Sequence, residues 1–429
     1  MCSAYILNIS LGNPPTHFSG MIDTGSGLVH LPCSDCKGCK QLAFFNASNS
    51  ATAVLSSCHS SGCAKICGAD STCSDPSTCS TTSCLCEHSD SKKCQYDIVY
   101  GDGTHSQGLV YTDTVRLPGS PSFTGIPLTF GCDVEASQDL FVQAVPALFG
   151  IDYQPASLYS QMLAAGAISD SLTICLGDGI HLSDPLAAGF LILGFSSFTV
   201  PYATATTAAR RIDPATWTGQ SGMVPSGLWL QLTSLTLGDD GVNSVGRSSH
   251  PVPALLDTGT SFTLLPGAVY RSFLKQLKAL VSAMPDNTAS YSVSINGSSL
   301  RGTPRGSSSA SPRPGNPANS ISNSSPGSMS RFPTQLVDLS CCGTTPIIST
   351  QDELNAAQLD ATFPPMVFSF PSFVNGSAWV QLSISASHYM IEVGPAEYAV
   401  FVQSSAPQEF AVFGNAMLNH LVVQVSATQ

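Results

Sequence analysis

The sequence carries little charge, and most of the charge it carries is acidic. Only 10% of the 429 residues are Asp, Glu, Lys or Arg, against about 25% in an average globular protein. The 16 basic residues are outnumbered by 28 acidic ones, which gives a net charge of −12. Nucleic-acid binders need a basic surface, so we expect no nucleic-acid partner. With few paired carboxylates to protonate, such a fold is also compatible with an acidic compartment.

Long hydrophobic segments are missing as well. No uncharged apolar run approaches the roughly 20 residues that a membrane helix needs, so we predict no membrane span in this chain. Residues 1–3 run directly into a strand-like segment without a signal-peptide pattern, so we expect either that the front end of a precursor is missing or that the gene model begins late. The nine histidines show neither H-x-x-x-H spacing nor a triad context, and we expect them at the surface.

Turn-forming residues and short apolar segments are what the chain has in abundance. It contains 36 Gly and 29 Pro, and 43% of its residues are hydrophobic, which indicates a β-rich chain long enough for two or three lobes. Alternation predicts strands at residues 5–11 and 18–22, separated by a turn at 12–15. A 3.6-residue period predicts helices at 157–167 and 267–282.

Cysteines are concentrated in one segment. Eleven of the 16 lie between Cys33 and Cys94, which is typical of a disulfide module in a secreted protein, although the sequence does not give the pairing. Zinc is the alternative, because Cys33-x-x-Cys36-x-x-Cys39 and Cys84-x-Cys86 have ligand-like spacing. Asn-x-Ser sequons point the same way as the disulfides, toward a glycoprotein of the secretory pathway. They begin at Asn8, Asn46, Asn296, Asn323 and Asn375.

A two-fold internal repeat is the strongest pattern. The segment 21–26, Met-Ile-Asp-Thr-Gly-Ser, is echoed by 255–260, Leu-Leu-Asp-Thr-Gly-Thr. Each copy is followed by two apolar residues and a glycine, at 148–150 and at 412–414. The second interval is longer because it contains a Ser/Pro/Gly/Asn tract at 301–331, which we expect to be a disordered insertion.

With these motifs the chain resembles the pepsin-type aspartic proteases over nearly its whole length. The cysteine-rich nepenthesin-like branch of plants and protists is the most similar. The resemblance implies an all-β, pepsin-like bilobal fold of two pseudo-symmetric β lobes with the active cleft between them. We expect residues 1–200 to form the N-terminal lobe, with the cysteine-rich insert 33–94 at its edge, and residues 201–429 to form the C-terminal lobe.

Two carboxylates that share one proton can hydrolyse a peptide bond without a metal or an organic cofactor. The ionised group takes a proton from water, and the protonated group supports the substrate carbonyl. Asp23 and Asp257 are the candidate pair. We therefore predict an aspartic endopeptidase that acts on polypeptide substrates, and we expect neither a metal site nor a cofactor.

The resemblance also implies supporting roles around this pair. The glycines let the backbones approach closely, the threonines bond across the lobes, and the hydroxyls after the glycines bond the outer carboxylate oxygens. A glycine-containing hairpin forms a flap that closes over substrate. The implied dyad-support residues are Thr24, Gly25, Ser26, Thr258, Gly259 and Thr260, and the implied flap residues are Tyr100, Gly101 and Asp102.

Some features depart from the family pattern. His30 stands where the family usually has a tryptophan that supports the flap tyrosine, so it could supply another hydrogen bond or make the site pH-sensitive. Cys341 and Cys342 are adjacent, and no cysteine follows them. Because the chain stops at Gln429, we expect the sheet shared by the lobes to be incomplete.

Two other functions stay open. The first alternative is a catalytically inactive binding or inhibitor-like protein on the same fold, against which both intact aspartates argue. The second is a metal-binding, cysteine-rich signalling protein. For the protease we expect a monomer in the secretory pathway, either extracellular or in a vacuolar or lysosome-like compartment, with the chloroplast as another destination.

Overall fold

A computed structural model describes most of both halves of the chain, and it contains mainly β-strands with a few short helices. The described residues are 5–39, 43–58, 60–67, 82–86, 93–101, 103–117, 125–137, 147–176, 189–194, 227–238, 244–245, 252–283, 292–295, 298–300, 346–350, 352–371, 379–418 and 422–425. The predicted insertion at 301–331 and the predicted boundary between the lobes at residues 200 and 201 lie outside them.

The N-terminal half is built on one nine-stranded sheet, in the order β1-β2-β9-β3-β8-β7-β6-β5 with β4 beside β7. Its first two strands and the turn between them lie where alternation predicts them. The strands are β1 (Ile6–Leu11), β2 (Thr16–Asp23), β3 (Val29–Lys37), β4 (Val54–Leu55), β5 (Thr82–Cys86), β6 (Cys94–Val99), β7 (His105–Arg116), β8 (Ile126–Ala136) and β9 (Ala147–Gly150).

The C-terminal half contains three smaller sheets. The first has the order β12 (Leu228–Leu232), β15 (Val252–Leu256), β25 (Ala411–Phe413), β16 (Thr263–Leu265) and β24 (Val402–Ser404). The second has the order β14 (Ser244–Val245), β13 (Ser234–Leu237), β20 (Met366–Pro371) and β21 (Trp379–Ile384). The third has the order β18 (Ser298–Leu300), β17 (Ser292–Ile295), β19 (Ile347–Ser349), β23 (Glu397–Val400) and β22 (Met390–Gly394).

Short helices cover these sheets. α2 (Leu158–Ala164) begins after Ser157, whose side chain caps it, and α3 (Gly267–Ala283) buries Phe273 and Leu277, so both predicted helices are confirmed. The others lack a long apolar period and were not predicted. They are α1 (Ser61–Cys67), the 3-10 turn η1 (Ala47–Asn49), α4 (Ala356–Thr362), α5 (Ala386–Tyr389) and α6 (Asn415–Leu418).

The sequence repeat has a structural counterpart in each half. β2 runs parallel to β9, which places Asp23 opposite Gly150, and β15 runs parallel to β25, which places Leu256 opposite Phe413. The strand after each D-T-G loop then pairs antiparallel with the same partner, as β3 does with β9 and β16 with β25. Each apolar-apolar-Gly segment therefore supports the strand that delivers an aspartate.

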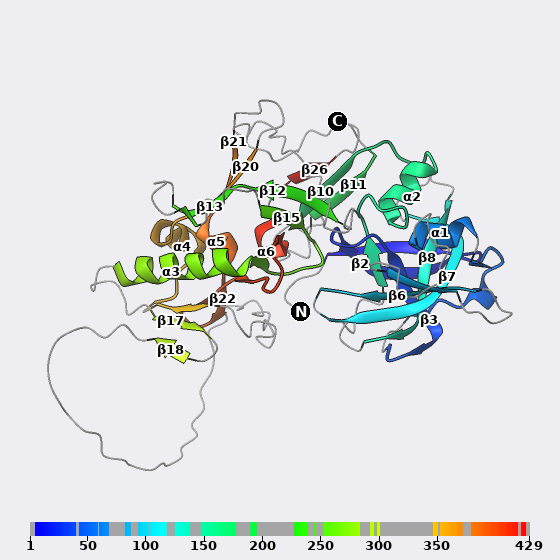
Figure 1. The fold of residues 1–429 in the computed structure, drawn as a ribbon, viewed down its shortest axis with the longest axis horizontal. Helices are drawn as coiled ribbons and strands as arrows, with labels where there is room; N and C mark the ends of the chain where they lie inside the picture. The colour runs from blue at the N-terminus through cyan, green and yellow to red at the C-terminus, as the bar shows by residue number, and fades with distance from the viewer. Residues whose placement is uncertain are drawn as a thin grey trace, which may run out of the picture.

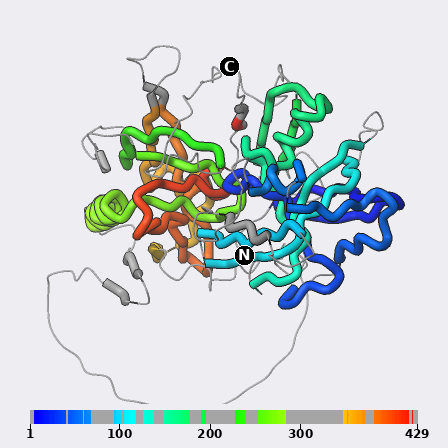
Figure 2. The backbone as a smooth tube through the Cα atoms, turned by 45° about the vertical axis from the view of Figure 1, so that its right-hand side comes forward, coloured from blue at the N-terminus to red at the C-terminus, as the bar shows by residue number. Residues whose placement is uncertain are grey.

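The two halves lie side by side and meet where β2 and β15 end, as Figures 1 and 2 show. A three-stranded sheet joins them, because β26 (Val422–Val425) pairs with β10 (Leu172–Leu176), which also pairs with β11 (Gly189–Leu193). The largest hydrophobic cluster likewise contains residues of both halves, including Ile22, Leu172, Leu256 and Phe413. The chain therefore has the expected all-β bilobal fold. None of the described helices is long and apolar enough to cross a membrane.

Candidate active site

The two D-T-G loops face each other at the junction of the halves. A Cβ built on Gly25 would lie 2.6 Å from Cγ of Asp257, and one built on Gly259 would lie 2.7 Å from Oδ1 of Asp23. Each glycine thus lies against the aspartate of the opposite loop, and no larger residue fits there without moving a carboxylate. The structure brings together the two aspartates that the sequence analysis paired.

Both loops are tied together by their threonines. The amide of Thr258 donates to Oγ1 of Thr24 at 3.0 Å, and the amide of Thr24 donates to Oγ1 of Thr258 at 3.1 Å. Each hydroxyl also donates across the junction, from Thr24 to the carbonyl of Leu256 and from Thr258 to that of Ile22. These four bonds are buried, so they fix the two loops relative to each other.

Each carboxylate is held by its own loop. The amide of Gly25 donates to Oδ1 of Asp23, and the amide of Gly259 donates to Oδ1 of Asp257, both at 2.8 Å. Thr260 donates to the outer oxygen, Oδ2, of Asp257 at 2.5 Å, as the resemblance implies.

Ser26, the residue equivalent to Thr260 in the first loop, differs. The Ser26 hydroxyl has no hydrogen-bond partner of ordinary geometry among the described residues. It nevertheless lies close enough to Asp23 to lower the pKa of that carboxyl. The expected bond from Ser26 is therefore not formed in this structure, and the two loops hold their outer oxygens unequally.

The environment of Asp23 favours its protonated form. Only 5% of this residue is exposed, and burial together with the charge of Asp257 raises the pKa of Asp23 well above its usual range. Both causes act because a buried carboxylate loses hydration and because like charges close together do not ionise independently. A pair in which one member holds a proton at a pH where an ordinary carboxyl would be ionised suits general acid–base chemistry.

The predicted flap is a hairpin. β6 and β7 pair from Gln95 opposite Leu109 to Val99 opposite His105, and the amide of Tyr100 bonds the carbonyl of Thr104 at the tip. The hairpin extends from the N-terminal half toward the C-terminal half (Figures 1 and 2). Gly101 is exposed at the tip, whereas Asp102 lies outside the described residues.

Comparison with known proteins gives a family model and several similar proteins. Residues 5–195 match the family model described as "Xylanase inhibitor N-terminal". The chain is 27% identical over 277 residues to aspartic proteinase nepenthesin-2 of Nepenthes gracilis, a match that covers 62% of this chain and 54% of that protein. It is 29% identical over 276 residues to nepenthesin-1 of the same plant, again covering 62% and 54%.

An aspartyl protease family protein of Arabidopsis thaliana is 28% identical over 284 residues, which cover 66% of this chain and 52% of that protein. These matches and the paired D-T-G loops agree. The chain is similar to the nepenthesin-like branch of the pepsin-type aspartic proteases. It spans about half the length of the curated relatives it matches.

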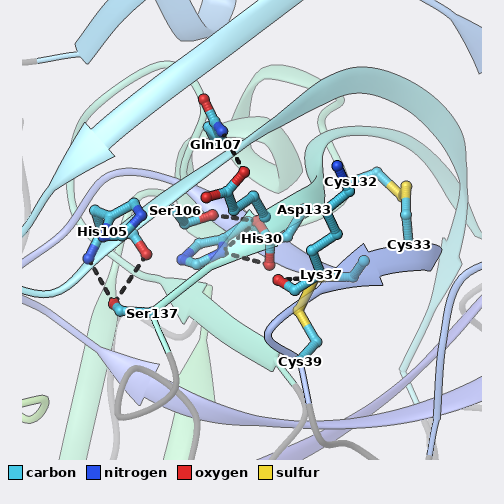
Figure 3. The surroundings of a disulfide bond; sticks show 12 residues. His30, Cys33, Lys37, Cys39, His105, Ser106, Gln107, Cys132, Asp133 and Ser137 are labelled. Atoms are coloured by element: carbon cyan, nitrogen blue, oxygen red, sulfur yellow. Dashed lines mark hydrogen bonds and ion pairs between the residues drawn. A yellow bond between two sulfur atoms is a disulfide. The ribbon is translucent and has the colours of Figure 1, made fainter.

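One residue of this nepenthesin-like chain is placed differently from our expectation for its histidines. His30 is fully buried on β3 instead of lying at the surface. Its Nδ1 lies 3.0 Å from Oδ1 of Asp133 on β8, and its Nε2 lies 2.6 Å from the hydroxyl of Tyr100. Figure 3 shows the ring of His30 directed at the carboxylate of Asp133. The sequence pointed to His30 because this residue stands where the family usually has a tryptophan, but nothing in the sequence indicated Asp133.

Several cysteines of the insert form disulfides in the structure. Cys33 is bonded to Cys132, Cys36 to Cys39, and Cys63 to Cys94. Cys67 places its sulfur within 4.8 Å of those of Cys63 and Cys94, and it is disulfide-bonded too. A sulfur in a disulfide is not the thiolate that zinc needs, so the zinc alternative is wrong for these cysteines.

Proposed function

We propose that the chain is an aspartic endopeptidase that hydrolyses peptide bonds with a water activated between Asp23 and Asp257. The observation that supports this most directly is that the glycine of each D-T-G loop lies against the aspartate of the opposite loop. One carboxylate takes a proton from the water while the other, protonated, supports the substrate carbonyl. We do not divide these roles between the two residues, because such a pair titrates as a unit.

The other predicted site residues act around that pair in this proposal. Thr24 and Thr258 hold the loops together, and Thr260 fixes the outer oxygen of Asp257. The hairpin that carries Tyr100 closes over an extended polypeptide substrate and excludes water from it. In this proposal Gly101 and Asp102 are substrate-binding residues together with Tyr100.

The experiment is peptide-library cleavage by the full chain across a range of pH, with Asp23→Asn and Asp257→Asn variants. General acid–base catalysis contributes about 100- to 10,000-fold, so each variant should lose at least about 100-fold in turnover. Asp352→Asn is the matched control, because this aspartate is exposed beside α4 and should leave turnover unchanged. A variant of the pair that keeps normal turnover would refute the assignment.

The inhibitor-like alternative predicts binding without turnover. The matched family model is described by the name of an inhibitor domain, but both aspartates and both loop glycines are present here. Wild-type protein that cleaves no peptide at any pH, yet is folded, would favour this alternative over the protease.

The cellular setting is a proposal as well. We propose a glycosylated monomer of the secretory pathway, extracellular or in a vacuolar or lysosome-like compartment, with the chloroplast as another destination. The disulfides support an oxidising compartment. Of the two described sequons, Asn46 is exposed at the start of η1, whereas Asn8 is in a paired strand. Asn46 is thus the better acceptor, and mass spectrometry of secreted protein tests its modification.

A further inference from the structure

A buried polar network lies behind the flap. Oδ1 of Asp133 accepts the hydroxyl of Tyr96 and the hydroxyl of Ser106, the latter at 2.5 Å, and it lies 3.0 Å from Nδ1 of His30. All four residues are at most 1% exposed. Oδ2 of the same carboxylate lies 3.1 Å from Nδ1 of His30, so both oxygens face the imidazole ring, and a carboxylate accepts through both.

The proton positions in this network follow from that charge. Burial and the charge of Asp133 raise the pKa of Tyr96 well above its usual range, so Tyr96 stays a donor. A carboxylate can only accept, so Nδ1 of His30 carries a hydrogen directed at Asp133. In a neutral imidazole the other nitrogen is then an acceptor. Nε2 of His30 therefore accepts the hydroxyl proton of Tyr100.

The backbone around His30 is firmly fixed. β3 and β8 run parallel, with His30 opposite Gly131. The disulfide between Cys33 and Cys132 joins the same two strands (Figure 3). A Cβ on Gly131 would lie 2.5 Å from the ring of Tyr96, so the glycine makes room for that ring. This rigid support contrasts with the exposed hairpin tip that it contacts.

The other half of the molecule has no such histidine at this place. In the repeat, His30 is seven residues after Asp23 and pairs with Leu148, and Leu264 is seven residues after Asp257 and pairs with Val412. An apolar side chain is thus sufficient for packing at this point of the repeat. His30 and Asp133 lie in the half that carries the flap. Their position indicates a role connected with Tyr100.

We propose that His30, oriented by Asp133, is a positioning residue that fixes the flap tyrosine Tyr100 for substrate binding. By accepting the hydrogen bond of the phenol, His30 fixes the direction of the Tyr100 hydroxyl on the flap that closes over the substrate. The rings of His30 and Tyr100 also stack, with centroids 6.0 Å apart and an interplanar angle of 23°. The kinetic part of this proposal rests on the proposed protease function.

Two amide variants separate positioning from structural support. The amide of Asn reaches the place of Nδ1, so His30→Asn keeps the bond to Asp133 and loses the one to Tyr100. The amide of Gln reaches the place of Nε2, so His30→Gln keeps the contact with Tyr100 and removes a donor from the buried carboxylate. We expect His30→Asn to raise KM about tenfold with kcat within about threefold, the effect of one lost hydrogen bond made equally in ground and transition states.

The Gln variant should show the opposite pattern. We expect its KM within about threefold of wild type but its Tm clearly lowered, whereas His30→Asn should keep a Tm near that of wild type. Tyr100→Phe should raise KM like His30→Asn, and the double variant should be no worse than either single one. A KM that follows Tm across the variants, or additive effects in the double variant, would overturn the proposal.

A measurement without substrate separates this proposal from the proposed function. In ¹⁵N-histidine NMR at a pH where the ring is neutral, the signal lost in His30→Asn should show hydrogen on Nδ1. Hydrogen on Nε2 in that neutral ring would overturn the proposal, whether or not the protein cleaves peptides. His17→Asn is the matched control, since exposed His17 bonds Ser10 on the far hairpin and its loss should leave both KM and the His30 signal unchanged.

Discussion

Thr24 and Thr258 exchange hydrogen bonds across 234 residues of sequence, and each hydroxyl both accepts and donates. Within one half alone, these amide, hydroxyl and carbonyl groups would lack their hydrogen-bond partners. Replacing one hydroxyl by a methyl group therefore leaves a buried amide and a buried carbonyl of the other half unpaired, which is the costly kind of hydrogen-bond loss.

Thr24→Val should consequently reduce the free energy of unfolding by about 2–6 kcal/mol, because each of the two unpaired buried groups costs about 1–3 kcal/mol. Thr24→Ser keeps the hydroxyl and should lose much less. Urea denaturation of the two variants beside wild type measures the difference. Equal stability of the Val and Ser variants would show that the crossed bonds do not hold the halves together.

Gly25 and Gly259 should tolerate no side chain. An alanine Cβ at Gly25 would lie 2.6 Å from Cγ of Asp257, and one at Gly259 would lie 2.7 Å from Oδ1 of Asp23. Since the obstacle is the opposite carboxylate, each alanine variant should fold but lose at least about 100-fold in kcat, the scale of a misplaced acid–base group. Gly267→Ala is the control, because a Cβ there meets only ordinary contacts at 3.4 Å or more and lies at the start of α3. The comparison uses kcat and far-UV circular dichroism.

The sequence predicted the central part of this site because the information there is local and repeated. Two D-T-G segments, each with a later apolar-apolar-Gly segment, indicated paired strands, and the observed parallel pairing of β2 with β9 and of β15 with β25 confirms it. The helices α2 and α3 were predicted for the same reason, since their apolar period lies within one segment. In the flap, the hairpin around Tyr100 was predicted correctly.

What the sequence did not give depends on long-range pairing. His30 and Asp133 are 103 residues apart, and only the parallel pairing of β3 with β8 brings them together. The disulfide between Cys33 and Cys132 bridges the same strands, and spacing could not reveal a partner outside the cysteine-rich segment. Short helices such as α5 and α6 contain too few residues to show a period.

Stability should depend on pH through Asp23. Its pKa is raised by burial and by the charge of Asp257, so the folded protein holds this proton more tightly than the unfolded chain. The stabilising effect is then complete below the unfolded pKa of about 3.9 and is lost as pH rises through the folded value. Asp23→Asn has no such proton to lose, so its stability relative to wild type should increase from about pH 4 upward. Urea denaturation at several pH values measures this, and a constant difference would contradict it.

Asp152 should also make the free energy of unfolding depend on pH, without changing how catalysis depends on pH. It lies just after β9, is 1% exposed, and accepts the amides of Gln154 and Gly227 at 2.8 Å, so it links the two halves. Burial raises the pKa of Asp152 to about 6. The folded state again prefers the proton, so about 3 kcal/mol of stability should be lost as pH rises from about 4 to about 6.

The measurement is the pH dependence of unfolding in Asp152→Asn. This variant loses one backbone acceptor and should be less stable than wild type at pH 4, but its curve should be flatter through pH 6. The kcat profile should keep its shape, because Asp152 is not one of the paired aspartates. Parallel stability curves for the two proteins would show that Asp152 does not titrate in this range.

The disulfide between Cys33 and Cys132 should matter most among those described. It closes a loop of 99 residues and ties β3, which carries His30, to β8, which carries Asp133. Loop-closure entropy gives on the order of 3–5 kcal/mol for a bridge of this span and less for a short one. Cys33→Ser/Cys132→Ser should therefore destabilise far more than Cys36→Ser/Cys39→Ser, whose bridge spans three residues. It should also raise KM, because it loosens the strand that orients His30, whereas the short-bridge control should not. Equal losses of stability in the two double variants, or a KM unaffected by removing the long bridge, would contradict this prediction.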